Sequence, residues 1–381
     1  MRLLSLSYKD VSFNWELEKS YFNELTLLVG ASGVGKTLIL KAINNLKDVA
    51  LGKSNNGIEW EVEFMTIEGI HYKWTGEFEN RGRFIFPDFD SKESQKNPPS
   101  IIREKIFRND IEIVNRSESE LFFKGEKTLK LPQQKSIIYL LKEEEVIGAA
   151  YNAFNKIIFS DQSDSQSVNL VFRMPNLTKL NKYETIEEIK KSDEQIIDKL
   201  FFCYQIKDKV FFQIKDRFID IFPNVEDIKV EPLEEDLMGD RFFSFLKDSP
   251  FIQIKEVGVD KWIQQTKISS GMFRTLIHIS ELYLSPEGTI FLIDEFENSL
   301  GINCIDELTT DILESSKQLQ FIITSHHPYI INNIHFSNWK LVTRKAGIVK
   351  TKNAQDYNIG DSKHEAFMQL LQLEEFQTGQ E

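Results

Sequence analysis

Apolar and polar positions alternate along the chain in two ways, and together these patterns predict an α/β fold. The stretch Leu25–Val29 is a short, almost continuous apolar run that ends at Gly30, which is typical of a buried strand entering a glycine-rich turn. Residues 38–46 then place apolar side chains at helical spacing. A strand, a loop and a helix therefore open the chain.

The final third of the chain repeats this alternation of strands and helices. Its expected elements are a helix over Lys267–Leu284, a strand over Thr289–Ile293, a helix over Cys304–Ser315 and a strand over Gln320–Thr324. Such alternation indicates a largely parallel sheet. Residues 58–75 instead alternate apolar and polar positions about Glu68-Gly69, which predicts an antiparallel hairpin with one solvated face, a β-rich annex.

The middle of the chain carries a different pattern, and we expect a mostly helical insertion or lid there. Residues 184–222 fit one or two amphipathic helices, strands are expected near 157–159 and 168–172, and residues 88–99 and 160–167 form polar loops. The predicted division is 1–90 and 261–350 for the two parts of an α/β head, 91–260 for the insertion, and 351–381 for a tail with an acidic amphipathic helix.

Composition narrows the class of protein. The 381 residues suffice for an α/β core with an additional subdomain, and 41% hydrophobic residues are enough to bury a core. No run approaches the roughly 18 apolar residues of a membrane span, and the amino terminus lacks signal-peptide features, so we expect a soluble, cytoplasmic protein. Cys203 and Cys304 are isolated, and the net charge of −13 opposes uniform attraction to DNA.

An eight-residue glycine-rich motif carries the strongest chemical signal. Residues 30–37 fit the Walker A pattern G-x-x-x-x-G-K-[ST] between the expected strand and helix. The loop amides would surround the phosphates of ATP, Lys36 would meet the β and γ phosphates, and the Thr37 hydroxyl would bind Mg²⁺. The expected nucleotide-binding residues here are Gly30, Ala31, Ser32, Gly33, Val34, Gly35, Lys36 and Thr37.

The strand over Thr289–Ile293 ends in two acids, Asp294 and Glu295, which is the Walker B arrangement. Both carboxylates should emerge at the carboxyl edge of the sheet, where α/β proteins bind ligands. Asp294 would hold Mg²⁺, and Glu295 would polarise the attacking water as the catalytic base.

Two further loops complete the set of motifs. Residues 268–274, Ile-Ser-Ser-Gly-Met-Phe-Arg, come immediately before the expected helix, so Ser269, Ser270 and Gly271 could bind phosphate or simply cap that helix. His326 and His327 follow an apolar strand, which places His326 near the phosphate edge.

These motifs together resemble the ABC-type ATPase heads of the SMC, RecF and OLD group, and specifically the compact ATPases of bacterial anti-phage systems such as PARIS and Septu. The resemblance covers roughly residues 1–50 and 260–345. It implies that the serine loop (Ser269–Gly271) acts as a signature loop on ATP held by the opposite subunit, and that His326 contacts the γ-phosphate. Ser270 and Met272 depart from the usual glycine and glutamine of that loop.

The resemblance also implies a homodimer or larger homo-oligomer, slow regulatory ATP hydrolysis, and a protein effector, a nuclease or toxin, from a neighbouring gene. Residues 296–301 would lie along the dimer interface, or form a plain turn. The alternative function is a DNA repair or recombination ATPase that binds DNA through Lys190, Lys191, Arg103 and Lys105. A transporter subunit or a kinase explains less of the motif set.

Two residues of such a site stay open in the sequence. An aromatic ring that stacks on adenine could be Phe13, Trp15 or Tyr21, although core packing explains each as well. A glutamine that senses Mg²⁺ could be Gln95, Gln133, Gln134 or Gln166.

Overall fold

The structure is a computed structural model of the chain. It describes residues 1–82, 98–160, 182–232, 250–298, 307, 309–312, 318–357, 359 and 363–380. The chain divides into two compact units. The first comprises residues 1–160, 287–296 and 315–381, and the second comprises 161–286 and 297–314.

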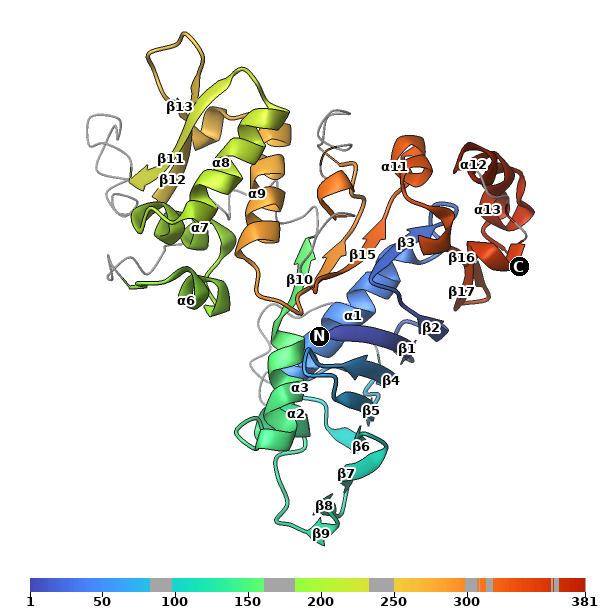
Figure 1. Cartoon of the computed structure of the whole chain (residues 1–381). Helices are drawn as coiled ribbons and strands as arrows, with labels where there is room; N and C mark the ends of the chain where they lie inside the picture. Colours follow the sequence, from blue (N-terminus) through green and yellow to red (C-terminus); the bar gives the residue numbers. More distant parts are fainter. Residues whose placement is uncertain are drawn as a thin grey trace. The chain divides into compact units, whose positions relative to one another are not determined.

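The first unit is built on one large mixed sheet (Figure 1). Within the described residues this sheet has 14 strands, in the order β10-β14-β15-β3-β16-β17-β2-β1-β4-β5-β6-β7-β8-β9. The strands are β1 (Arg2–Asp10), β2 (Trp15–Tyr21), β3 (Leu25–Val29), β4 (Ile58–Met65), β5 (His71–Phe78), β6 (Ile101–Arg108), β7 (Ile111–Ser117), β8 (Leu121–Phe123), β9 (Glu126–Lys127), β10 (Ile157–Ser160), β14 (Ile290–Ile293), β15 (Gln320–Thr324), β16 (Trp339–Lys345) and β17 (Ile348–Asn353).

The parallel part of the sheet runs from β10 to β16 and contains the strands predicted before the two catalytic motifs. Every residue of β3, β14 and β15 is buried, as expected for parallel strands with both faces covered. Their largely apolar sequences therefore follow from their place inside the sheet, where both faces of each strand are covered. Because all three run in the same direction, their carboxyl ends meet at one edge of the sheet.

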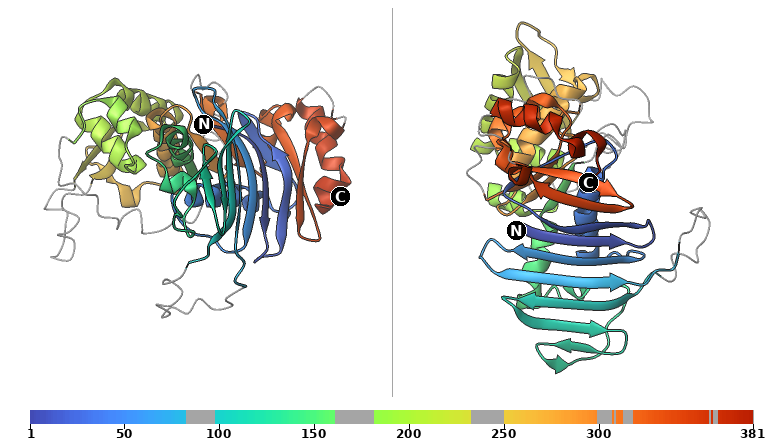
Figure 2. Two further views of the ribbon diagram at one scale, coloured as in Figure 1. Left: turned by 90° about the horizontal axis from the view of Figure 1, so that it is seen from below. Right: turned by 90° about the vertical axis from the view of Figure 1, so that its right-hand side faces the viewer.

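The antiparallel part of the sheet forms the annex, and it is larger than predicted. Strands β4 and β5 pair antiparallel as the expected hairpin (Figure 2). Buried residues alternate with half-buried ones along both strands. Residues 101–127, however, form β6 to β9, which extend this sheet, so the expectation of a mostly helical segment from residue 91 is wrong there. The period-two pattern of β6 is too weak to predict a strand from the sequence. Pairing with β5 supplies the backbone hydrogen bonds that make this segment a strand.

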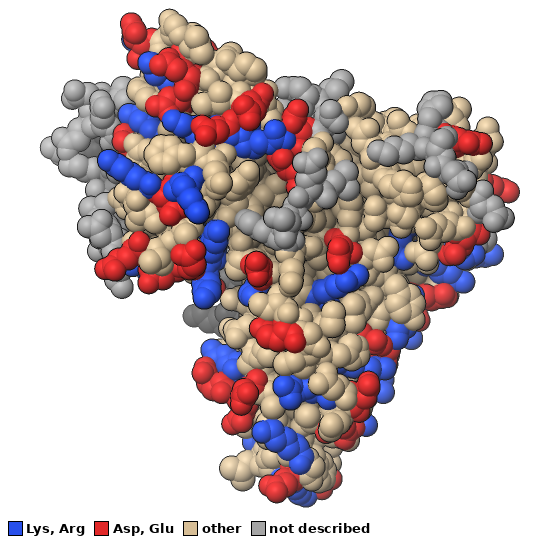
Figure 3. Space-filling view, in the orientation of Figure 1, with Lys and Arg blue, Asp and Glu red and all other residues tan. Residues whose placement is uncertain are grey.

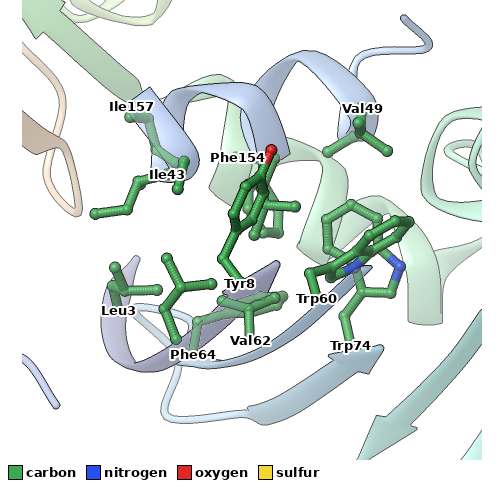
Figure 4. Close-up of a cluster of buried hydrophobic side chains, with 14 of the residues drawn as sticks. Leu3, Tyr8, Ile43, Val49, Trp60, Val62, Phe64, Trp74, Phe154 and Ile157 are labelled. Atoms are coloured by element: carbon green, nitrogen blue, oxygen red, sulfur yellow. The ribbon is translucent and has the colours of Figure 1, made fainter. Parts of the chain in front are cut away.

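Helices α1 (Lys36–Ala50), α2 (Ile137–Leu140) and α3 (Glu145–Asn155) pack against the apolar face of the annex. Figure 4 shows Trp60, Trp74 and Phe154 meeting in this core. The Phe154 ring lies edge-on to Trp74, with centroids 5.2 Å apart. Aromatic contacts of this kind add to apolar burial and fix the helices on the sheet that carries the Walker A loop.

The carboxy-terminal part of the first unit returns to the sheet and ends in helices. After α11 (Pro328–Asn333) and a short 3-10 helix, η4 (Phe336–Asn338), strands β16 and β17 pair antiparallel. A second 3-10 helix, η5 (Ala354–Tyr357), precedes α12 (Lys363–Gln372) and α13 (Glu374–Thr378). The predicted tail thus holds two short helices where one was expected, and its first residues, 351–353, belong to β17.

The second unit combines helices with a small sheet. Its elements are α6 (Ile186–Lys191), α7 (Ile196–Gln205), α8 (Lys209–Ile221), β11 (Val225–Pro232), β12 (Pro250–Glu256), β13 (Ile263–Gln264), the 3-10 helix η3 (Gln265–Lys267) and α9 (Ser270–Leu284). The amphipathic helices expected over residues 184–222 are confirmed, as three helices. The antiparallel sheet β11-β12-β13 was not predicted.

Several sequence predictions fall outside the described residues, namely the polar loop over most of 88–99, the strand at 168–172 and most of the helix expected at 304–315. Residues 307 and 309–312 of that helix are described and are helical. The α/β head with a mixed sheet and an antiparallel annex is confirmed. In the portion of the chain that is described, no helix is long and apolar enough to cross a membrane.

Candidate functional site

The Walker A loop joins β3 to α1 and adopts a conformation that requires glycine. Gly30, Gly33 and Gly35 have φ values of 148°, 82° and 108°, a region that residues with a Cβ rarely adopt. A Cβ on Gly30 would lie 2.5 Å from the carbonyl oxygen of Val342 on β16, so the loop also lies too close to β16 for a side chain. No side-chain hydrogen bond caps α1, whose amino terminus therefore presents backbone N–H groups toward an anion.

Lys36 is the first residue of α1 and is only 6% exposed. Its Nζ donates hydrogen bonds to the carbonyl oxygens of Gly30, at 2.8 Å, and Ala31, at 2.9 Å. The start of the Walker A loop thus holds the Lys36 ammonium group inside the loop. A positive charge held there would attract the β and γ phosphates of a nucleotide.

The two acids of the Walker B motif follow β14 directly, as predicted. Asp294 is buried, and its Oδ1 accepts a hydrogen bond from the Thr37 hydroxyl at 3.1 Å. The structure therefore brings together the two residues expected to bind Mg²⁺, which are 257 positions apart in the chain. A hydroxyl and a carboxylate side by side match the oxygen ligands that Mg²⁺ takes from proteins when phosphates supply the others.

Glu295, the expected catalytic base, has an unusual backbone. Its φ is 46°, in the left-handed region, which is uncommon for a residue with a side chain. Its backbone N–H donates to the Thr324 hydroxyl at 2.7 Å, and the same hydroxyl donates to Asp294 Oδ1 at 2.7 Å. Strained conformations of this kind persist where neighbouring bonds fix them, often at active sites.

Thr324 belongs to none of the sequence motifs that predict the site. It ends β15, and its position after an apolar strand was visible in the sequence Ile322-Ile323-Thr324. The sequence gives no signal that its hydroxyl would bond to the Asp294 carboxylate and to the Glu295 backbone, which follow another strand.

The two histidines after β15 differ in their surroundings. His327 Nδ1 accepts a hydrogen bond from Tyr329 N at 3.3 Å, so this side chain caps α11. His326 is exposed and follows Ser325 at the carboxyl edge of β15.

The serine loop lies in the second unit, at the amino terminus of α9. Ser269 is the N-cap, and its hydroxyl accepts a hydrogen bond from Met272 N at 3.2 Å. Ser269 and Ser270 are exposed, and Gly271 is half-buried. The loop therefore caps its helix, as one interpretation of the sequence expects, while its side chains stay accessible to a ligand from solvent or from another molecule.

The structure describes the surroundings of several candidates for the adenine-stacking ring and for the glutamine that senses Mg²⁺. Trp15 is buried and packs against Tyr8, with ring centroids 5.3 Å apart, whereas Phe13 and Tyr21 are each 60% exposed and do not serve core packing. Among the glutamines, Gln133 donates to the carbonyl oxygen of Glu118. Gln95 and Gln166 lie outside the described residues.

A contact that the sequence did not indicate involves the end of the chain. Gly379, just after α13, is buried, and its carbonyl oxygen accepts a hydrogen bond from Arg344 N on β16 at 2.8 Å. A Cβ at Gly379 would lie 2.4 Å from Val34 Cγ1 and 3.2 Å from Ala31 Cβ. The carboxy-terminal segment therefore packs against the Walker A loop.

Searches against known proteins give a family and a group of structures. Residues 25–332 match the family described as "AAA domain, putative AbiEii toxin, Type IV TA system". No curated protein sequence matches the chain.

Three of the similar solved structures are heads of SMC proteins. One is an SMC head bound to the C-terminal winged-helix domain of ScpA, with 16% identity, a TM-score of 0.45, and coverage of 92% of this chain and 97% of that one. A second is the SMC head domain from Thermotoga maritima, with 15% identity, a TM-score of 0.43, and coverage of 93% and 99%. The third, from Pyrococcus furiosus, is an SMC head with an extended coiled coil bound to the C-terminal domain of ScpA, with 14% identity, a TM-score of 0.47, and coverage of 97% and 98%.

The assignment rests on the family match, which spans most of the chain, and on the geometry of the loop and the acid pair. The chain belongs to this AAA-domain family of P-loop ATPases.

Proposed function

We propose that this chain binds Mg²⁺ and ATP at the edge formed by β3, β14 and β15, and hydrolyses ATP there. The observation that carries the proposal is the arrangement of Thr37, Asp294 and Glu295, with Lys36 held inside the loop. Thr37 and Asp294 would hold Mg²⁺, which would neutralise charge between the β and γ phosphates. Glu295 would orient the attacking water, and His326 would contact the γ-phosphate.

Two substitutions separate binding from hydrolysis. Glu295→Gln keeps the shape of the side chain but removes the catalytic base, so it should retain ATP binding and abolish hydrolysis. The ATP-bound, closed oligomer should then accumulate, which size-exclusion chromatography would detect. Lys36→Ala should lose nucleotide binding, because it removes the positive charge from the loop. Equal hydrolysis rates in wild type and Glu295→Gln would refute the role of Glu295.

We further propose that the serine loop of one copy completes the ATP site of a second copy. Exposure of Ser269 and Ser270 beside the amino terminus of α9 supports this, because that terminus and the hydroxyls can bind phosphate. In a symmetric dimer, each of two equivalent sites would combine the Walker A loop of one copy with the serine loop of the other.

Mixing two inactive variants tests this arrangement. Lys36→Ala spoils the Walker A loop, and Ser270→Arg would spoil the serine loop. In a mixed dimer, one site would combine the intact Walker A loop of one copy with the intact serine loop of the other, so an equimolar mixture should recover about a quarter of wild-type activity. A mixture as inactive as each variant alone would show that the loops do not act between copies.

In the cell, we propose that the ATPase acts as a sensor or scaffold that controls a nuclease or toxin in anti-phage defence. The family description, which names a putative toxin and a toxin–antitoxin system, supports a role of this class. Purification with and without the product of the neighbouring gene tests it. A monomer whose ATPase activity is indifferent to that product would count against the proposal.

The DNA-binding alternative loses part of its basis. Arg103 forms ion pairs with Glu59 and Glu77, and Lys105 pairs with Glu112 at 3.3 Å. On the face shown in Figure 3, basic and acidic side chains are interspersed rather than gathered into a basic patch. Salt-dependent DNA affinity would restore this alternative.

A further inference from the structure

The Thr324 side chain bonds to both residues of the Walker B acid pair, to the carboxylate of Asp294 and to the backbone of Glu295. It is buried at the end of β15, and β15 pairs in parallel with β14, which the acids follow. Its hydroxyl donates to Asp294 Oδ1 and accepts from the backbone N–H of Glu295, each at 2.7 Å. A hydroxyl can make both bonds at once because it carries one hydrogen and two lone pairs.

The backbone of Thr324 reinforces this link. Its carbonyl oxygen accepts a hydrogen bond from Phe296 N at 3.0 Å. The two peptide N–H groups that flank the Glu295 α-carbon, those of Glu295 and Phe296, are therefore both bonded to the same threonine. These bonds account for the left-handed φ of 46° at Glu295, since a residue with a Cβ adopts that conformation only where its surroundings fix it.

We infer that Thr324 is a positioning residue for hydrolysis, whose hydroxyl orients the Asp294 carboxylate and fixes the backbone that aims Glu295. The inference rests on the proposed hydrolysis of ATP. Asp294 Oδ1 accepts from Thr37 on one side and from Thr324 on the other, so its carboxylate has a set rotation before a metal binds. Preorganisation of this kind acts on the chemical step more than on substrate binding.

The experiment replaces the hydroxyl by a methyl group of similar size. Thr324→Val should lower kcat by about 10- to 100-fold, because the lost bonds orient the catalytic base Glu295 and the Asp294 carboxylate. KM for ATP should change by less than about threefold, because these bonds do not contact the adenine or the ribose of ATP. Thr324→Ser, which keeps the hydroxyl, should stay within about threefold of wild-type kcat. The Mg²⁺ concentration for half-maximal activity should rise in Thr324→Val, because Asp294 is less well oriented.

Thr26→Val supplies a matched control. Thr26 is a buried threonine on β3, the strand next to β15, and its hydroxyl accepts from Asn23 N at the opposite end of the strand from the site. It should lose stability as Thr324→Val does but keep wild-type kcat per folded molecule. Urea unfolding of both variants gives the folded fraction.

Each outcome decides the inference. If wild type hydrolyses ATP, Glu295→Gln does not, and Thr324→Val matches wild type, the role of Thr324 is refuted while the proposed function stands. Equal losses in Thr324→Val and Thr26→Val would make the effect purely structural and would also refute it. If wild type itself does not hydrolyse ATP, the proposed function and this inference both fail.

Discussion

The buried ion pair of Glu104 and Arg116 offers a quantitative test of how the annex is held together. Glu104 on β6 is fully buried and accepts hydrogen bonds from Trp74 Nε1 at 3.0 Å and from the Ser136 hydroxyl at 2.6 Å. Arg116 Nη1 lies 3.4 Å from its second oxygen, and the Arg116 side chain is 3% exposed. One carboxylate thus joins two strands to the chain that leads into α2.

The expected cost of Glu104→Ala follows from what remains behind. Breaking a buried pair by removing one partner costs about 3–5 kcal/mol, because the other charge stays buried without a counter-charge. Arg116 keeps its hydrogen bonds to the carbonyl oxygens of Lys135, at 2.8 Å, and Pro132, at 2.6 Å, so the cost here should lie toward the lower end of that range. The Trp74 and Ser136 donors add to this, since an unsatisfied buried polar group costs roughly 1–3 kcal/mol. We therefore expect the free energy of unfolding to fall by about 5 kcal/mol, a large share of the roughly 5–15 kcal/mol of a typical domain.

Arg103, the neighbouring residue on β6, is the matched control. Its side chain is 58% exposed and pairs with Glu59 and Glu77 on the solvated face. Exposed pairs contribute about 0–1 kcal/mol, so Arg103→Ala should cost no more than that. The two adjacent residues lie on opposite faces of the sheet, one solvated and one buried.

The assay is urea unfolding followed by far-ultraviolet circular dichroism, because Trp74 fluorescence would itself respond to Glu104→Ala. ATP affinity of the folded fraction should stay unchanged in both variants. Similar losses of stability for Glu104→Ala and Arg103→Ala, each below about 1 kcal/mol, would refute the reasoning. A double replacement of Glu104 and Arg116 by apolar residues should recover the part of the loss that comes from the unpaired charge, but not the part that comes from the Trp74 and Ser136 donors.

Two further predictions use other parts of the chain. Gly30→Ala should abolish the ATP binding measured by calorimetry, because the new Cβ would lie 2.5 Å from the carbonyl oxygen of Val342. Gly69 is the control, since it has a φ of 79° but open space around it. Gly69→Ala should lower the free energy of unfolding by only about 1 kcal/mol and leave the ATP affinity intact. Burial, together with the Glu194 charge, raises the pKa of Asp198 to about 6, so the folded state holds a proton that the unfolded state releases. The free energy of unfolding therefore falls as pH rises from about 4 through 6. Asp198→Asn should raise the free energy of unfolding at pH 7 by about 1 kcal/mol, after allowance for solvent screening, and urea unfolding should show this gain shrinking toward pH 4. A gain independent of pH would contradict the raised pKa of Asp198.

The sequence by itself determined those features that depend on a few consecutive residues. The Walker A loop needs a strand, eight residues and a helix in order, and the backbone demands of Gly30, Gly33 and Gly35 are local. The acids after β14 were likewise predictable, because a continuous apolar strand ends there. Helices over residues 184–222 followed from a strong 3.6-residue period.

Only the tertiary structure decided which distant residues meet. Strand β6 carries a weak alternation, and its assignment depended on pairing with β5, which no local pattern specifies. The bonds of Thr324 to Asp294 and Glu295, and the packing of Gly379 against Val34, join segments far apart in the chain. Strand order and register place these residues together, and a one-dimensional period carries no information about which strands become neighbours.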